Sequence, residues 1–248
     1  VKRWSRHQGS ESRGLIQLTK AGGLGNYNAT LNDCHAGLVY GHALNIAAEL
    51  GTYIINGGLY GHNGGNGIRV SGDTITFTGS ATNRLRVVRA VNIASNDWHG
   101  INLQNATVSK MEWVDIATVT TGNNLKLTAG NPLKVENCRF MGKLTPTANA
   151  SVLLSGVTAT MNLTNSTVVG GGSNYNPFQT GGNNNSDMTM TDSIFTSENL
   201  GQILNNNADD VGHITFNNCA VPTDSVSAES LNPLVPITNA DTVATPNF

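Results

Sequence analysis

The sequence predicts an all-β chain folded as a parallel β-solenoid of about seven to eight coils. Three observations lead to this prediction. A short motif returns at nearly constant spacing, apolar and polar residues alternate around each copy, and helical segments are almost absent between the copies. A barrel or doubly wound sheet needs amphipathic helices of about 10–15 residues between its strands. Only residues 41–50 are a weak helical candidate, and they read equally well as a strand.

The composition allows a packed core and argues against two classes of function. The chain has 248 residues, 38% of them hydrophobic, and 28 glycines, which is near the globular norm. Charged residues make up only 12% and the net charge is −2, whereas 33 asparagines and 27 threonines supply neutral polar groups. We expect no nucleic-acid partner, which would require a basic stripe. We also expect no membrane span, because no apolar run reaches about 18 residues.

The two ends of the chain differ from the middle. Residues 1–25 carry five basic side chains against one acidic one, and we interpret them as a basic linker or arm. A linker to an upstream domain is favoured over an arm for an anionic partner. The predicted solenoid covers residues 26–221. Residues 222–248 hold four of the seven prolines and lack the repeat, so they are expected to form an extended tail or cap.

The repeat is clearest in the second half of the chain. Each copy reads apolar, polar, Asn or Asp, Cys or Ser, any residue, apolar, and the copies are VENCRF at 135–140, LTNSTV at 163–168, MTDSIF at 190–195 and FNNCAV at 216–221. The Asn or Asp is the expected corner of each coil, which places corners at Asn137, Asn165, Asp192 and Asn218. Their spacings of 28, 27 and 26 residues predict coils of nearly equal length.

Earlier corners are less regular but continue the same period. We place them at Asp33, Asn56, Ala90 (or Arg89) and Trp113. The 185 residues from Asp33 to Asn218 then divide into seven intervals of about 26 residues.

Alternation around the corners indicates strands with one buried face. The positions one and three before a corner are mostly polar, and the position two before it is apolar, as at Leu31, Ile54, Val88, Met111, Val135, Leu163, Met190 and Phe216. A further strand opens most intervals after Gly or Asn, at 67–72, 100–105, 124–130, 151–156, 176–182 and 201–207. Each coil is therefore expected to contain strands on both sides of its corner and one opening strand.

The cysteines fit the interior of this repeat. Cys34, Cys138 and Cys219 each directly follow a corner, so we predict three buried free thiols. Cys138 and Cys219 lie three coils apart, about 14 Å, which is beyond the roughly 7 Å limit for a disulfide. No Cys or His cluster has metal-ligand spacing, and neither a metal nor another cofactor is expected.

Corner asparagines in register, each followed by a small inward residue, resemble the right-handed parallel β-helix of the pectate-lyase-like superfamily. The resemblance covers about residues 33–221. It implies a single-stranded, right-handed β-helix with an asparagine-type corner ladder, in which stacked amides hydrogen-bond to their neighbours. Trp113 and the pair Gly57–Gly58 interrupt the pattern.

The opening strands supply a candidate glycan site. Ile68, Ile101 and Leu125 are expected to point inward, so the next residue of each strand should point outward and stack with its neighbours. The candidate glycan-binding residues are the three stacked ones and two from a preceding loop, namely Arg69, Asn102, Lys126, Trp98 and His99. In the resembled family this face often forms a glycan groove, and loops 60–67 and 94–100 are long enough to wall one here.

Catalysis at this site is an open alternative. A polysaccharide lyase needs a base for the acidic sugar proton and a cation to neutralise the uronate carboxylate. Lys126 or His99 matches the base and Arg69 the cation by residue type alone. The sequence shows neither an acidic calcium cluster nor a catalytic signature of pectate lyases, and a plain polar surface accounts for the same residues.

A second outward column combines opposite charges. Lys110 with Glu112 and Lys134 with Glu136 occupy equivalent positions one coil apart. Two neighbouring carboxylates about 5 Å apart suit a retaining glycosidase. Because each glutamate has a lysine on the same strand face, a solvated ion-pair patch is the favoured interpretation.

These features predict an extracellular or virion appendage that binds host or environmental surface glycans. The chain resembles the β-helix domains of phage tailspikes and tail fibres, which implies host attachment and a possible homotrimer. A secreted polysaccharide lyase or glycoside hydrolase is the alternative, so enzymatic activity stays uncertain. A structural surface adhesin is the third possibility.

Overall fold

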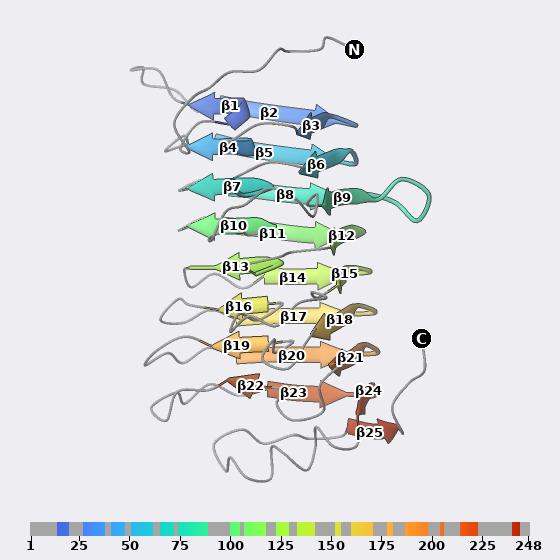
Figure 1. Ribbon diagram of the computed structural model, residues 1–248. Coiled ribbons are helices and arrows are strands. Elements are labelled where there is room, and N and C mark those ends of the chain that lie inside the picture. Colours follow the sequence, from blue (N-terminus) through green and yellow to red (C-terminus); the bar gives the residue numbers. More distant parts are fainter. Residues whose placement is uncertain are drawn as a thin grey trace.

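The computed structural model describes residues 14–19, 27–37, 41–47, 51–61, 65–71, 74–88, 100–104, 107–117, 123–128, 133–141, 152–154, 160–170, 178–180, 187–197, 204–205, 214–222 and 240–243. Every regular element in these residues is a β-strand, and every strand pairing is parallel. The strands stack one above another along the chain (Figure 1). The predicted all-β parallel solenoid is therefore confirmed.

Within the described residues, the strands form three parallel sheets. Sheet A contains, in spatial order, β1 (Gly14–Thr19), β4 (His42–Ala47), β7 (Ile68–Ser71), β10 (Ile101–Gln104), β13 (Leu125–Leu127), β16 (Val152–Leu154), β19 (Phe178–Thr180) and β22 (Leu204–Asn205). Sheet B contains β2 (Tyr27–Asn32), β5 (Gly51–Asn56), β8 (Thr74–Thr78), β11 (Thr107–Glu112), β14 (Leu133–Glu136), β17 (Thr160–Thr164), β20 (Asp187–Thr191) and β23 (Ile214–Asn217).

Sheet C contains β3 (His35–Gly37), β6 (Leu59–Gly61), β9 (Leu85–Val88), β12 (Val114–Ala117), β15 (Arg139–Met141), β18 (Thr167–Gly170), β21 (Ile194–Ser197), β24 (Cys219–Pro222) and β25 (Ala240–Val243). The chain visits sheets A, B and C in turn, and each strand pairs with one from the next circuit. Strands also lie outside the predicted solenoid limits of 26–221. β1 pairs with β4 in sheet A, and β25 pairs with β24 in sheet C.

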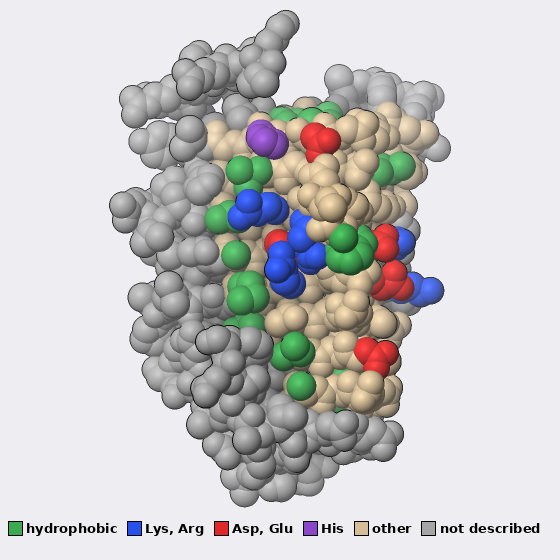
Figure 2. All heavy atoms as spheres, turned by 90° about the vertical axis from the view of Figure 1, so that its right-hand side faces the viewer, with side chains coloured by type: hydrophobic (Ala, Val, Ile, Leu, Met, Phe, Trp, Pro, Cys, Tyr) green, Lys and Arg blue, Asp and Glu red, His purple; other side chains and the backbone are tan. Residues whose placement is uncertain are grey.

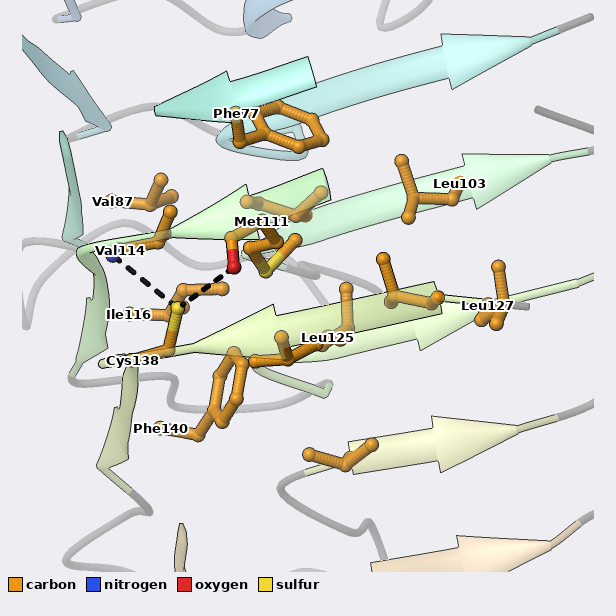
Figure 3. Packing of buried hydrophobic residues seen from close by; sticks show 14 of the residues in the cluster. Phe77, Val87, Leu103, Met111, Val114, Ile116, Leu125, Leu127, Cys138 and Phe140 are labelled. Atoms are coloured by element: carbon orange, nitrogen blue, oxygen red, sulfur yellow. Dashed lines mark hydrogen bonds between the residues drawn. The ribbon is translucent and has the colours of Figure 1, made fainter. Parts of the chain in front are cut away.

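The core is an apolar column enclosed by the three sheets. Inward side chains alternate with outward ones, as in β8, where Ile75 and Phe77 are fully buried between half-buried threonines. Figure 3 shows apolar side chains from all three sheets meeting in this interior, among them Phe77, Leu103 and Phe140. Alternation along the sequence therefore becomes burial because one face of every sheet lines the same interior.

The corners between sheets B and C adopt left-handed backbone geometry. Positive φ angles of 47° to 56° occur at Asp33, Trp113, Asn137, Asn165, Asp192 and Asn218. Asn and Asp tolerate this region better than other residues that have a Cβ. Six predicted corners are thus confirmed, including Trp113, which keeps the same geometry without an amide side chain.

Two predicted corners are wrong. Asn56 ends β5, and the left-handed residue is Gly57 with φ 63°. The inward residue is accordingly Ile55, whereas Ile54 is 39% exposed. The corner expected near Ala90 is misplaced as well. Leu85–Val88 is already β9 of sheet C, so the chain turns within residues 79–84, where Ser80 N–H donates to the Asn83 carbonyl at 2.9 Å.

Outward side chains at the corners form short hydrogen-bonded steps. The Asn165 amide donates to Asn137 Oδ1 at 2.5 Å, and the Asn218 amide donates to Asp192 Oδ1 at 2.5 Å. Further up, Asn56 Nδ2 donates to Asn32 Oδ1 at 3.3 Å. Each of these hydrogen bonds joins two successive circuits, so the outward amides help to hold neighbouring circuits together.

A second row runs inside the same corners. The Cys138 N–H donates to Ser166 Oγ at 3.1 Å, and the Ser166 N–H donates to Ser193 Oγ at 3.0 Å. Each hydroxyl donates in turn to the carbonyl two residues earlier, from Ser166 to Thr164 at 2.9 Å and from Ser193 to Thr191 at 2.7 Å. Small side chains with one donor and one acceptor therefore satisfy the buried corner without leaving polar atoms unpaired.

The thiols belong to this inner row. Cys138 and Cys219 are each 1% exposed, whereas Cys34 is only half-buried, so the prediction of three fully buried thiols is wrong for Cys34. All three are free. Cys138 Sγ accepts the Val114 N–H at 3.4 Å and donates to the Met111 carbonyl at 3.6 Å (Figure 3).

We expect a thiol reagent to modify Cys34 well before the other two cysteines of the native protein. Burial raises the pKa of Cys138 to about 12 and also raises that of Cys219, and the reactive species is the thiolate. Titration with a chromogenic disulfide should count about one fast thiol in native protein and three in denaturant. Cys34→Ala should remove the fast phase. Fast labelling of Cys138 would contradict its position in the core.

Candidate functional site

The predicted glycan column lies on sheet A, at the strands β7, β10 and β13, and the structure extends it to Asn45 of β4 (Figure 1). Backbone register pairs Asn45 with Arg69, Arg69 with Asn102, and Asn102 with Lys126. Four polar or charged residues thus occupy consecutive positions on one sheet, about 4.8 Å apart. The structure brings Arg69, Asn102 and Lys126 together as the sequence predicted.

The column is less open than a simple groove. Asn102 is only 4% exposed and Asn45 only 2%, whereas Arg69 and Lys126 are half-buried. Arg69 donates from Nε and Nη2 to Gln104 Oε1, at 3.3 and 2.9 Å. Asn102 Oδ1 has no hydrogen-bond partner in the described part of the chain. The two cations therefore flank a buried amide whose oxygen accepts no hydrogen bond from the described residues.

The two loop candidates lie outside the described residues. Trp98 and His99 belong to the segment 89–99, and residues 62–64 of the other predicted groove wall are likewise not described. Their roles, and those of Arg69, Asn102 and Lys126 as ligands or catalytic groups, stay predictions.

A histidine beside this column is held neutral. The Nδ1 atom of His42 accepts the Asn66 backbone N–H at 2.8 Å, and the residue is 8% exposed. Burial, together with the positive charge of Arg69, lowers the pKa of His42 to about 4. His42 therefore stabilises the loop before β7 as a hydrogen-bond acceptor.

Sheet C carries a charged cluster that sequence reasoning missed. Arg86 of β9, Asp115 of β12 and Arg139 of β15 are consecutive partners in register. Figure 2 views this side of the solenoid and shows basic side chains gathered around an acidic one near its middle. Arg84 completes the group with a 2.6 Å contact from Nε to Asp115 Oδ1. We call these four residues the arginine cluster.

Arg84 is fixed by three contacts. Besides Asp115, its Nη2 donates to the Asn137 carbonyl at 2.5 Å, and its guanidinium lies 5.2 Å from the centroid of the Trp113 ring. Arg139 donates to the same carboxylate, through Nε at 2.8 Å to Oδ1 and through Nη2 to Oδ2. Both oxygens of Asp115 are thus occupied, and the hydrogen bonds to Asp115 raise the pKa of the Arg139 guanidinium further.

Arg86 differs from its two neighbours. Its side chain is exposed and makes no ion pair or hydrogen bond in the described part of the chain. The only sequence signal for the cluster is the basic pair at 84 and 86. The sequence prediction put the corner near Ala90 and therefore assigned Leu85–Val88 to the strand before the corner. In the structure this segment is β9 of sheet C, which follows the turn, and only there does Arg86 lie beside Asp115.

The ion-pair patch on sheet B forms at one of its two positions. Lys110 Nζ lies 2.5 Å from Glu112 Oε2, which raises the pKa of Lys110. Glu112 and Glu136 are partners in register. In the described residues, Lys134 and Glu136 do not reach ion-pair distance.

Within the described residues, no group of three His, Cys, Asp or Glu side chains is arranged to hold a metal ion. Likewise, that part of the chain contains no helix with the length and apolar character needed to cross a membrane. Comparison with known proteins gave no match to any family model, any curated protein or any solved structure.

Proposed function

We propose that this protein binds surface glycans through the polar column on sheet A, as part of an extracellular or virion-associated appendage. The observation that supports the proposal is the register of Arg69, Asn102 and Lys126 on three adjacent strands. Cations spaced along an extended array suit the hydroxyl and carboxylate groups of a linear polysaccharide. The low share of charged residues, 12%, and the 33 asparagines and 27 threonines suit a surface that also hydrogen-bonds to sugar hydroxyl groups.

The finer description of the fold is part of the same proposal. We propose a right-handed, single-stranded β-helix of about seven to eight coils, similar to the pectate-lyase-like superfamily. Parallel strands of one sheet joined by a crossover are right-handed in about 98% of cases, which supports the handedness. Tailspike-like trimer formation is an expectation from the resemblance alone, and light scattering of the purified chain would test it.

The test is a glycan array followed by measured affinities for an acidic oligosaccharide that binds. Arg69→Ala combined with Lys126→Ala should weaken binding by at least about 100-fold, because each lost charge-assisted hydrogen bond costs roughly 1.5–3 kcal/mol. Arg69 and Lys126 are both half-buried on a sheet face instead of in the core, so circular dichroism should stay unchanged.

Lys134→Ala is the matched control for this double substitution. Lys134 is exposed on sheet B and makes no ion pair in the described residues, so its loss should change affinity little. If Lys134→Ala loses as much affinity as the double variant, or if the double variant binds as tightly as the parent, the glycan site is not on sheet A. Ultraviolet absorbance from unsaturated products during the same incubations would instead support a polysaccharide lyase.

A further inference from the structure

The arginine cluster has more positive charge than its carboxylate can neutralise. Two guanidinium groups bind the Asp115 carboxylate and the third belongs to Arg86, its register neighbour, which leaves a local charge of +2 on a chain whose net charge is −2. The Asp115 carboxylate neutralises one of the three positive charges, so the remaining charge makes the guanidinium groups repel one another. An anion bound at the cluster would remove that repulsion.

Two of the arginine side chains are already held in place by contacts within the protein. Arg84 is held by Asp115, the Asn137 carbonyl and the Trp113 ring, and its side chain is only 15% exposed. Arg139 is held by Asp115 yet remains 52% exposed. Binding through side chains that are already ordered costs less conformational entropy than binding through mobile ones. The Arg86 side chain stands exposed beside them with no partner in the described residues.

Corner amides and an aromatic side chain border the cluster. The corner amides of Asn137 and Asn165 are hydrogen-bonded to each other next to it, and Asn165 is exposed. The half-buried Trp113 packs against Arg84. A small group of cations beside hydrogen-bonding amides and an aromatic ring suits a polymer that has many hydroxyl groups and widely spaced negative charges. Nucleic acid has a phosphate at every nucleotide, and a protein that makes, for example, about 6–10 phosphate contacts needs more cations than the three of this cluster.

We propose that the arginine cluster is a binding site for the sulfate or carboxylate groups of an acidic polysaccharide. Arginine pairs with both groups through two parallel N–H donors. Arg86 and Arg139 lie two strands apart, about 9.6 Å at about 4.8 Å per strand, so one extended chain can reach both. The site is on sheet C, so it does not rest on the column proposed on sheet A.

Inorganic sulfate is the first probe, measured by calorimetry against chloride at equal ionic strength. Arg86→Gln should weaken sulfate binding at least about tenfold, which corresponds to losing one charged contact. Because the Arg86 side chain has no partner to lose in the described residues, this variant should keep the thermal midpoint of the parent. Arg86→Gln with Arg139→Gln should weaken binding further.

Lys134→Gln is the matched control, since it removes one exposed charge that is unpaired in the described residues of sheet B. It should bind sulfate within about twofold of the parent. The sheet A variant, Arg69→Ala with Lys126→Ala, should keep the part of sulfate binding that depends on Arg86, which separates failure of this site from failure of the proposed function. If Arg86→Gln behaves like Lys134→Gln, or the parent binds no sulfate, the site does not exist.

Polymers then identify the group that is recognised. Polygalacturonate tests carboxylates and dextran sulfate tests sulfate esters, each with the parent and Arg86→Gln. Loss of either interaction in Arg86→Gln supports the proposal and names the group. Oligothymidylate that binds more tightly than both polymers, with the same dependence on Arg86, would assign the cluster to nucleic acid and overturn the polysaccharide proposal.

Discussion

Gly58→Ala should destabilise the solenoid by about 3 to 5 kcal/mol, because it combines backbone strain with a clash in the core. Gly58 has a φ of 97°, a region that residues with a Cβ rarely adopt. A Cβ built there would lie 2.3 Å from the Cys34 carbonyl oxygen and 2.9 Å from its nitrogen. Both atoms belong to the backbone, and the Cys34 carbonyl accepts the Leu59 N–H of the next circuit at 3.0 Å, so neither can move aside cheaply.

The preceding residue offers a matched control. Gly57 has a φ of 63°, close to the values at the asparagine corners. Its Cβ would meet only the ends of the Asp33 and Asn83 side chains, at 2.5 and 2.9 Å. Gly57→Asn should therefore change stability by less than about 1 kcal/mol. Urea unfolding of both variants measures the difference, and equal losses would mean that the contact with Cys34 is misplaced.

Stability should also fall as the pH drops from about 6.5 to about 4, and His42 should account for about 2 to 3 kcal/mol of the fall. The pKa of His42 is about 4 in the folded protein, against 6.5 for a histidine fully surrounded by water. In this window the unfolded chain binds a proton that the folded chain excludes, so acid favours unfolding. Well above pH 6.5 His42 is neutral in both the folded and the unfolded state, so its protonation no longer lowers the free energy of unfolding.

His42→Asn separates the contribution of His42 from that of the Asp and Glu side chains, which also take up protons at acidic pH. An asparagine oxygen can accept the Asn66 N–H that His42 Nδ1 accepts at 2.8 Å, and it carries no titrating group. The free energy of unfolding, measured in urea from pH 4 to 7, should therefore vary less in the variant than in the parent. Parallel curves would show that His42 is not shielded from protonation.

Much of the fold could be predicted because its signals are local. Residues at alternate positions of a strand face opposite sides, so the sequence alone identifies Met111 and Val135 as inward, and both are fully buried. A corner needs left-handed backbone, and an Asn or Asp followed by Cys or Ser supplies both that geometry and a small buried hydrogen-bonding group. All of these requirements fall within six consecutive residues, so each copy of the motif can be recognised in the sequence.

The candidate site was only partly predictable. Stacking of Arg69, Asn102 and Lys126 follows from the period alone, and the register bears it out. The burial of Asn102 to 4% exposure does not follow, because alternation places the residue on the outer face without saying what lies over that face.

The sequence by itself determined the all-β parallel solenoid, six of its corners and many of the residues that line its core, because each depends on spacing along the chain. Only the tertiary structure decided the corner at Gly57, the turn within 79–84, the neutral His42 and the arginine cluster. Arg84 and Arg139 reach Asp115 from 31 and 24 residues away. Such a meeting depends on the exact length of every intervening coil, and a single misplaced corner is enough to hide it.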